Sequence, residues 1–193
     1  MLSSVEKIKF INNILPPSTN TEIIKLLTET KWQVGIDKET NNARYNDLFS
    51  GKYYGFSYDP YNLQRSQSNP FTNAQTRSDY ELFLYGKIIF QKVCHEINFK
   101  KAKLVRLIYN MYYPHHNTST HTDVTSVEES VECYSILYNL HTTDGGTEVD
   151  NCFYKDQMGQ AKVFLSNINH KGIGPKKDNV RFSLNILADR YIK

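Results

Sequence analysis

The sequence predicts an α+β protein in which helices come first and an antiparallel β-sandwich or jelly roll follows. Apolar residues recur at helical spacing in the N-terminal half of the chain. From residue 104 onward, short segments rich in β-branched and aromatic residues alternate with Gly, Asn and Asp turns, and no helical pattern separates them. At 193 residues the chain fits one domain, 1–193, with a helical support region over about 1–103 and a jelly-roll core over about 104–190.

Two capping boxes predict where the helices begin. Thr19, with Glu22 three residues later, is expected to open a first helix after a short early strand at 8–11. Ser78, with Glu81, is expected to open the longest helix. The apolar stripe of this second helix predicts that it packs on one face of a sheet. The stripe consists of Leu82, Tyr85, Ile89, Val93 and Ile97.

Four segments are predicted as strands because they are short and rich in β-branched and aromatic residues. They are Leu104–Tyr109, Tyr134–Leu140, Ala161–Leu165 and Arg181–Leu187. The region between residues 32 and 70 is polar, aromatic and turn-rich, so we expect loops and short edge strands there.

The composition excludes several classes of protein. A net charge of +3 argues against a nucleic-acid partner, and the apolar runs are too short to cross a membrane. The first residues lack the apolar core of a signal peptide, and the three cysteines have no metal-type spacing. We therefore expect reduced thiols and a cytoplasmic protein. The sequence leaves the oligomeric state open.

A candidate metal site begins with His121 and Asp123. Residues two apart on a strand point to the same face, so both side chains could reach one ion. His170, after the third predicted strand, would supply a third ligand. Two histidines and one carboxylate form the facial triad of non-haem Fe(II) oxygenases, which leaves positions open for a bidentate co-substrate and dioxygen. A structural zinc site would need four protein ligands. The alternative is a polar loop with a surface histidine.

Arg181 and Ser183 share one face of the last predicted strand. A guanidinium binds a carboxylate through two parallel hydrogen bonds, so it could anchor the far end of a dicarboxylate co-substrate. A surface ion pair is the alternative, but an arginine inside an otherwise apolar strand argues against it. The remaining histidines are expected at surface turns or at element ends, with His116 the nearest rival as a metal ligand.

At these residues the sequence resembles the 2-oxoglutarate/Fe(II) oxygenases, specifically the prolyl 4-hydroxylase-like branch. The resemblance runs over most of the chain and lies in the order of several motifs. These are Ile8–Pro16 with the helix at Glu22–Leu27, Tyr112-Tyr113-Pro114, His121-Thr122-Asp123, Tyr138-Asn139-Leu140, Gly145–Glu148, Gly159–Phe164, His170 and Arg181–Asn185.

The resemblance implies a double-stranded β-helix core with N-terminal helices packed on one sheet. It implies that His121, Asp123 and His170 bind Fe(II) and form the catalytic centre. Arg181, assisted by Ser183, would hold the distal carboxylate of the co-substrate 2-oxoglutarate. Tyr112 stands where the family often has a tyrosine that reaches 2-oxoglutarate, and Asn110 shares its strand face. On a neighbouring strand, residues Ser135, Leu137 and Asn139 would point inward.

The implied reaction consumes dioxygen, decarboxylates 2-oxoglutarate to succinate and hydroxylates a C–H bond of a peptide residue, prolyl in type, or of a small metabolite. Many prolyl 4-hydroxylases carry lysine where Arg181 stands, which weakens the prolyl assignment. Two alternatives stay open: a nucleobase demethylase of the same superfamily, and a non-catalytic β-sandwich that serves as a binding or particle-associated module. We also expect the aromatic stretch Tyr53–Tyr61 and the acidic loop Val124–Glu132 to form the substrate mouth.

Overall fold

The computed structural model describes residues 7–30, 33–34, 55–58, 77–124, 131–177 and 180–191. Two helices lie in these ranges, α1 (Pro17–Thr28) and α3 (Arg77–Glu96). The strands are β1 (Ile8–Ile11), β2 (Gln33–Val34), β3 (Gly55–Tyr58), β4 (Ala102–Tyr112), β5 (Val131–Asn139), β6 (Gly146–Val149), β7 (Cys152–Lys155), β8 (Ala161–Leu165), β9 (His170–Ile173) and β10 (Arg181–Tyr191).

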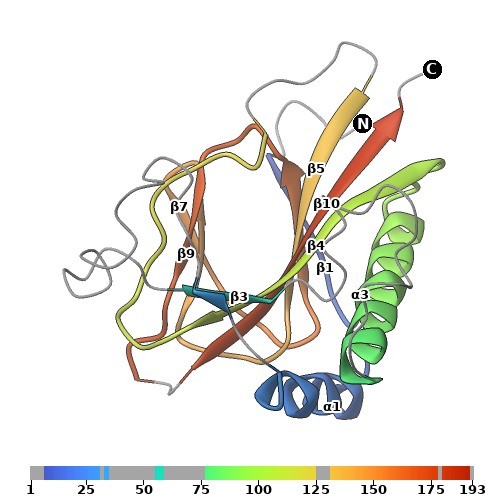
Figure 1. Ribbon diagram of the computed structural model, residues 1–193. Coiled ribbons are helices and arrows are strands. Elements are labelled where there is room, and N and C mark those ends of the chain that lie inside the picture. The colour runs from blue at the N-terminus through green and yellow to red at the C-terminus, as the bar shows by residue number, and fades with distance from the viewer. Residues whose placement is uncertain are drawn as a thin grey trace.

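The strands form two antiparallel sheets (Figure 1). The larger sheet has the order β1-β8-β5-β10-β4-β3-β2, and the smaller has the order β7-β6-β9. All pairs are antiparallel, and the long strand β10 lies between β4 and β5. The early strand β1 joins the larger sheet beside β8, so the N-terminal segment is part of the sheet that carries the core.

Both helices begin earlier than the capping boxes predict. Helix α1 starts at Pro17, with Pro16 as its N-cap and no side-chain cap. Proline suits the first helical position because it has no N–H to leave unpaired and its φ is already helical. Helix α3 already includes Arg77, so Ser78 lies inside the helix and cannot be its cap. Both capping-box predictions were therefore wrong, although the helices themselves are present.

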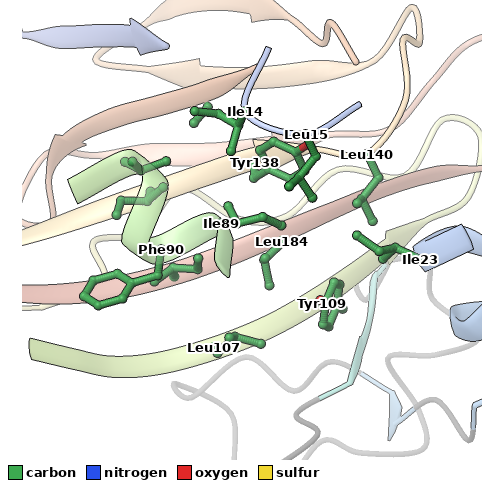
Figure 2. Packing of buried hydrophobic residues seen from close by; sticks show 14 of the residues in the cluster. Ile14, Leu15, Ile23, Ile89, Phe90, Leu107, Tyr109, Tyr138, Leu140 and Leu184 are labelled. Carbon is green, nitrogen blue, oxygen red and sulfur yellow. The ribbon is translucent and has the colours of Figure 1, made fainter. Parts of the chain in front are cut away.

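The main hydrophobic core lies between the two helices and the larger sheet (Figures 1 and 2). The predicted stripe of α3 is confirmed at Leu82, Ile89 and Val93, which are fully buried. Gly86 lets this helix approach the sheet closely, since a Cβ there would lie 2.2 Å from a methyl carbon of Leu107. The hydroxyl group of Tyr138, on β5, donates a hydrogen bond to Oδ1 of Asn20, on α1, at 2.7 Å.

Successive residues of the central strands serve opposite faces of the larger sheet. Phe182 and Leu184 of β10 belong to the helix-side core, whereas Arg181 and Ser183 are buried on the other face. On β5, the inward-pointing set Ser135, Leu137 and Asn139 is buried as predicted. Leu137 and Phe164 of the larger sheet pack with Val149 of the smaller sheet, which joins the two sheets.

The four predicted strands are confirmed as parts of β4, β5, β8 and β10. Strands β6, β7 and β9 were not predicted, and each has four residues with mixed polarity. Most of the proposed substrate mouth, including nearly all of Tyr53–Tyr61 and Val124–Glu132, lies outside the residues whose side chains the structure describes. Over the described residues, neither helix combines the length and apolar character that a bilayer crossing requires.

Candidate metal centre

The three predicted metal ligands converge. One possible donor atom each from His121, Asp123 and His170 lies within 4.8 Å of the other two. Nε2 of His170 is 3.6 Å from Oδ2 of Asp123, and the two imidazole ring centres are 4.4 Å apart. Over the described residues, no second group of three such side chains is close enough to share an ion.

The backbone places these ligands without a regular strand at His121. His121 makes an isolated β-bridge with His170, in which each backbone N–H donates to the other residue's carbonyl oxygen at 2.9 Å. Asp123 lies in a bend, and its N–H donates to the carbonyl oxygen of Ser166 at 2.9 Å. The predicted strand through 121–123 was therefore wrong, although its two side chains do meet. His170 follows β8, as predicted, and is itself the first residue of the short strand β9.

Both imidazoles are oriented through their Nδ1 atoms. Nδ1 of His121 lies 2.9 Å from the carbonyl oxygen of Ser119, and Nδ1 of His170 lies 3.0 Å from that of Ile168. A carbonyl oxygen only accepts hydrogen bonds, so each Nδ1 carries the proton and each Nε2 keeps a lone pair. Nε2 of His170 is buried and has no hydrogen-bond partner among the described residues. A buried lone pair beside a second imidazole and a carboxylate fits a bound metal ion.

The electrostatics favour the ligand forms of these side chains. Burial lowers the pKa of His170, against the opposing effect of Asp123, so the ring is held neutral. Burial alone would raise the pKa of Asp123, but the charge of Arg106 and hydrogen bonds from Ser135 and Arg106 outweigh it and lower the pKa. A neutral imidazole and an ionised carboxylate are the forms that bind a divalent metal.

The predicted co-substrate anchor lies on the same inner face of the larger sheet. Arg181 is 1% exposed, and its guanidinium carbon stacks 4.6 Å from the ring centre of Tyr112, its register partner on β4. Its Nη2 donates to Oγ1 of Thr147 at 3.2 Å, while Nη1 has no hydrogen-bond partner among the described residues. Ser183 stands in register with Asn110 on one side and Asn139 on the other.

Sequence reasoning missed two charged residues beside this arginine. Nε of Arg181 donates to Oδ2 of Asp156 at 2.5 Å, and Nζ of Lys162 lies 2.7 Å from Oδ1 of the same carboxylate. All three side chains are 2% exposed or less. The signal was available, because Lys162 interrupts the apolar strand Ala161–Leu165 in the same way that Arg181 interrupts its own strand.

The other histidines are not ligands in the described part of the chain. His141 uses Nε2 to accept a hydrogen bond from the backbone N–H of Phe182 at 2.9 Å. His115 has a positive φ of 64° at an exposed turn, and the former rival His116 stacks edge-on against Tyr113 with ring centres 6.4 Å apart. None of these three joins the metal cluster.

Two antiparallel sheets carrying a two-histidine, one-carboxylate cluster on their inner side are the arrangement of the 2-oxoglutarate/Fe(II) oxygenases, and the chain has the fold of that class. Three solved structures illustrate the likeness. The viral collagen prolyl hydroxylase of Paramecium bursaria Chlorella virus-1, solved with 2-oxoglutarate, has a TM-score of 0.60 at 12% identity, over 98% of this chain and 99% of that chain.

A prolyl hydroxylase in complex with a hypoxia inducible factor peptide fragment from Trichoplax adhaerens has a TM-score of 0.63 at 14% identity, over 97% of this chain and 84% of that chain. The carbocyclase SnoK from nogalamycin biosynthesis has a TM-score of 0.66 at 9% identity, over 96% of this chain and 80% of that chain. No protein-family profile matches the sequence, and neither does any curated protein.

Proposed function

We propose that this protein is a 2-oxoglutarate- and Fe(II)-dependent dioxygenase that hydroxylates a C–H bond. The reaction would decarboxylate 2-oxoglutarate to succinate. The single observation that carries the proposal is the convergence of His121, Asp123 and His170, with the buried and unpartnered Nε2 of His170 facing the carboxylate. Two imidazoles and one carboxylate leave half of an octahedral shell for co-substrate and dioxygen.

The strand pairing supports a double-stranded β-helix core. In the larger sheet, β8-β5-β10-β4 run antiparallel side by side, and in the smaller sheet β7-β6-β9 do the same. Isolated bridges of Asn117 with Ile173 and of His121 with His170 continue the smaller sheet with the segment after β4. Apart from the β6–β7 hairpin, consecutive segments thus alternate between the two sheets, as in a jelly roll. The segments that carry His121 and His170 are neighbours in the smaller sheet. The backbone N–H of Asp123 donates to the carbonyl oxygen of Ser166, directly after β8.

The chain's own residues would bind and orient the reactants. A ferrous ion held by the triad would supply the oxidation chemistry. Arg181 offers Nη1 toward the distal carboxylate of 2-oxoglutarate, with Tyr112 fixing the guanidinium plane from one side. Ser183 and Asn110, on the same inner face, would assist with hydrogen bonds. Burial of Arg181 keeps water from competing with the carboxylate, which strengthens the pairing.

For the substrate we propose a peptide residue of prolyl type or a small metabolite. The neighbours include a prolyl hydroxylase in complex with a peptide fragment and a carbocyclase from nogalamycin biosynthesis, which supports keeping both kinds of substrate. A net charge of +3 gives no strong support to a nucleobase demethylase. A non-catalytic module would not need a complete metal triad together with a buried arginine anchor.

The test is an anaerobic titration of the purified protein with Fe(II) and then with 2-oxoglutarate. We expect a visible metal-to-ligand charge-transfer band that requires both additions and is lost in His170→Ala. Succinate release upon admission of air, with peptide and metabolite panels, would then identify the substrate. Absence of the band in a folded protein saturated with Fe(II) would refute the proposal and leave a binding module.

A further inference from the structure

The buried charges around Arg181 do not balance. The guanidinium of Arg181 and the ammonium of Lys162 both contact the carboxylate of Asp156, one on each oxygen. Two cations and one anion leave one net positive charge in a region where all three side chains are almost fully buried. The polar groups that contact these charges, from Asn139, Thr147 and Tyr112, are neutral. A buried uncompensated charge is costly unless an ion of opposite sign pairs with it.

We propose that Lys162, through Asp156, makes the anchor cationic and thereby sets the protein's selectivity for a 2-oxo acid with an anionic far end. Lys162 is a positioning residue in this proposal, and it need not touch the co-substrate. The inference rests on the function proposed above and gives roles to Lys162 and Asp156, to which the resemblance assigns none. The proposal predicts that the preference for a 2-oxo acid with an anionic far end depends on the charge of the cluster more than on its shape.

Without Lys162, Arg181 would be a weaker binding site for the carboxylate of a co-substrate. Asp156 takes the Nε edge of the guanidinium at 2.5 Å, which would neutralise the arginine as a binding site for a second carboxylate. Lys162 compensates by pairing with the other oxygen of Asp156 at 2.7 Å. The carboxylate is then shared by two cations, and the guanidinium retains positive charge on the side of Nη1, which has no hydrogen-bond partner among the described residues.

The contacts of Lys162 hold its ammonium group beside Asp156. The amide of Asn139 accepts from Nζ of Lys162 at 2.9 Å and donates to Oδ1 of Asp156 at 3.0 Å when its oxygen and nitrogen are assigned to satisfy both partners. Burial lowers the pKa of Lys162, and the charge and hydrogen bond of Asp156 oppose that effect. Asp156 itself has a lowered pKa, since Arg181 and Lys162 together outweigh the opposing effect of burial.

The rival explanation is that Lys162 only satisfies a buried carboxylate and so stabilises the fold. The two explanations differ in what they predict for ligands of different charge. A structural role would change the binding of all 2-oxo acids by the same factor. If Lys162 acts through its charge, its loss would weaken the binding of 2-oxoglutarate. The binding of 2-oxopentanoate, which lacks the distal carboxylate, would not change.

The experiment measures the binding of both ligands by calorimetry, with the full chain loaded with Mn(II). This measurement needs no turnover. The variants are Lys162→Met, which makes the cluster neutral; Lys162→Gln, which keeps a hydrogen-bond donor but not the charge; and Asp156→Asn with Lys162→Met, which restores a net charge of +1. Lys7→Met is the matched control, because Lys7 forms an exposed ion pair with Asp150 away from the anchor. Thermal unfolding of each variant checks the fold.

We expect the preference for 2-oxoglutarate over 2-oxopentanoate to fall about tenfold or more in both single variants, the scale of one charge interaction at an effective dielectric of about 20. The double variant should recover most of the preference, and the control should keep all of it. Lys162→Gln decides the outcome if Lys162→Met does not fold. An unchanged preference in the folded single variants, or a double variant as poor as the single ones, would overturn the inference.

Failure of the proposed function would look different. In that case the unaltered protein would bind neither 2-oxo acid in the presence of Mn(II), and no comparison of variants would arise. If the unaltered protein binds 2-oxoglutarate but the charge variants keep its preference, the proposed function stands and only the role given to Lys162 is wrong.

Discussion

Arg106 donates a hydrogen bond to Oδ1 of Asp123, the only carboxylate of the metal triad, from the adjacent inner face of β4. Their side chains are 11% and 3% exposed, so the pair is shielded from water. Ser135 donates to the other oxygen of Asp123 at 2.5 Å and lies 3.0 Å from Oγ of Ser166. Both carboxylate oxygens are thus oriented by the protein before any metal binds.

Arg106→Ala should weaken metal binding by roughly tenfold to a hundredfold, the usual cost of losing a group that orients a metal ligand. The physical reason is that Asp123 would lose its fixed rotamer and the cation that lowers its pKa. Calorimetric titration with Mn(II) measures the effect. Arg77→Ala is the control, because Arg77 forms an exposed pair with Glu81 on α3. Unchanged or tighter metal binding in Arg106→Ala would contradict the orienting role.

Substitution of two metal ligands should separate function from stability. His121→Ala and Asp123→Ala should both abolish turnover, since each removes a ligand. His121 is exposed, so its loss should leave the stability of the metal-free protein nearly unchanged. Asp123→Ala leaves the charge of Arg106 buried and unpaired, which should cost about 3 kcal/mol of unfolding free energy. Chemical denaturation of the metal-free variants measures this difference, and equal stabilities would argue against a tight pair.

Arg181→Ala should raise the 2-oxoglutarate concentration needed for half-maximal turnover by about tenfold to a hundredfold, which corresponds to one lost charge-assisted hydrogen bond of about 1.5–3 kcal/mol. Metal binding should persist, because the arginine does not belong to the ligand cluster. Steady-state succinate formation at varied 2-oxoglutarate measures the change. An unaltered co-substrate requirement would remove Arg181 from the binding site.

Gly172→Ala should weaken 2-oxoglutarate binding without loss of metal. A Cβ at this position of β9 would lie 2.7 Å from the hydroxyl oxygen of Tyr112 and 2.8 Å from its ring, so the tyrosine must shift and its stacking on Arg181 must change. The matched control is Gly86→Ala, which should crowd Leu107 on the helix side and lower stability by about 1–3 kcal/mol while sparing co-substrate binding. Calorimetry of both variants distinguishes the local effect from general overpacking.

Acid should destabilise the protein partly through Asp156. Its folded-state pKa is lowered because Arg181 and Lys162 outweigh the opposing effect of burial. Its contribution to stability is therefore fully present above the unfolded value near 3.9 and is lost as the pH falls from there through the folded pKa. The stability difference between the unaltered protein and Asp156→Asn should shrink over that window. Urea denaturation at stepped pH measures this difference.

The proposed metal ligands and the proposed anchor could be picked out from the sequence because each stands out against its local pattern. Arg181 interrupts an apolar strand, and His121 with Asp123 forms a recognisable spacing. The prediction of an inward face on β5 succeeded for the same reason, since alternation along a strand is a local property. The convergence of His170 with the other two ligands depends on a backbone bridge between distant segments, which only the tertiary structure shows.

What could not be predicted lies where local signals are weak or misleading. Strands β6, β7 and β9 have only four residues each, and their polarity does not alternate clearly. The capping boxes misplaced both helix starts because proline at the first turn offers a competing start signal for α1, and Arg77 already belongs to α3. Asp156 and Arg106 act through partners remote in sequence, so neither has a local signature.

Side chains of β10 alternate between the two faces of the larger sheet, and this alternation limits which sequence changes the strand can accept during evolution. Phe182 and Leu184 pack in the helix-side core, while Arg181 and Ser183 are buried on the opposite face, where we propose that the co-substrate binds. A one-residue insertion early in this strand would exchange the two sets, placing a guanidinium among hydrocarbon and aromatic rings at the reaction centre. Length changes should therefore be tolerated in the turns and eliminated by selection within β10, while point substitutions on either side of the strand can accumulate separately.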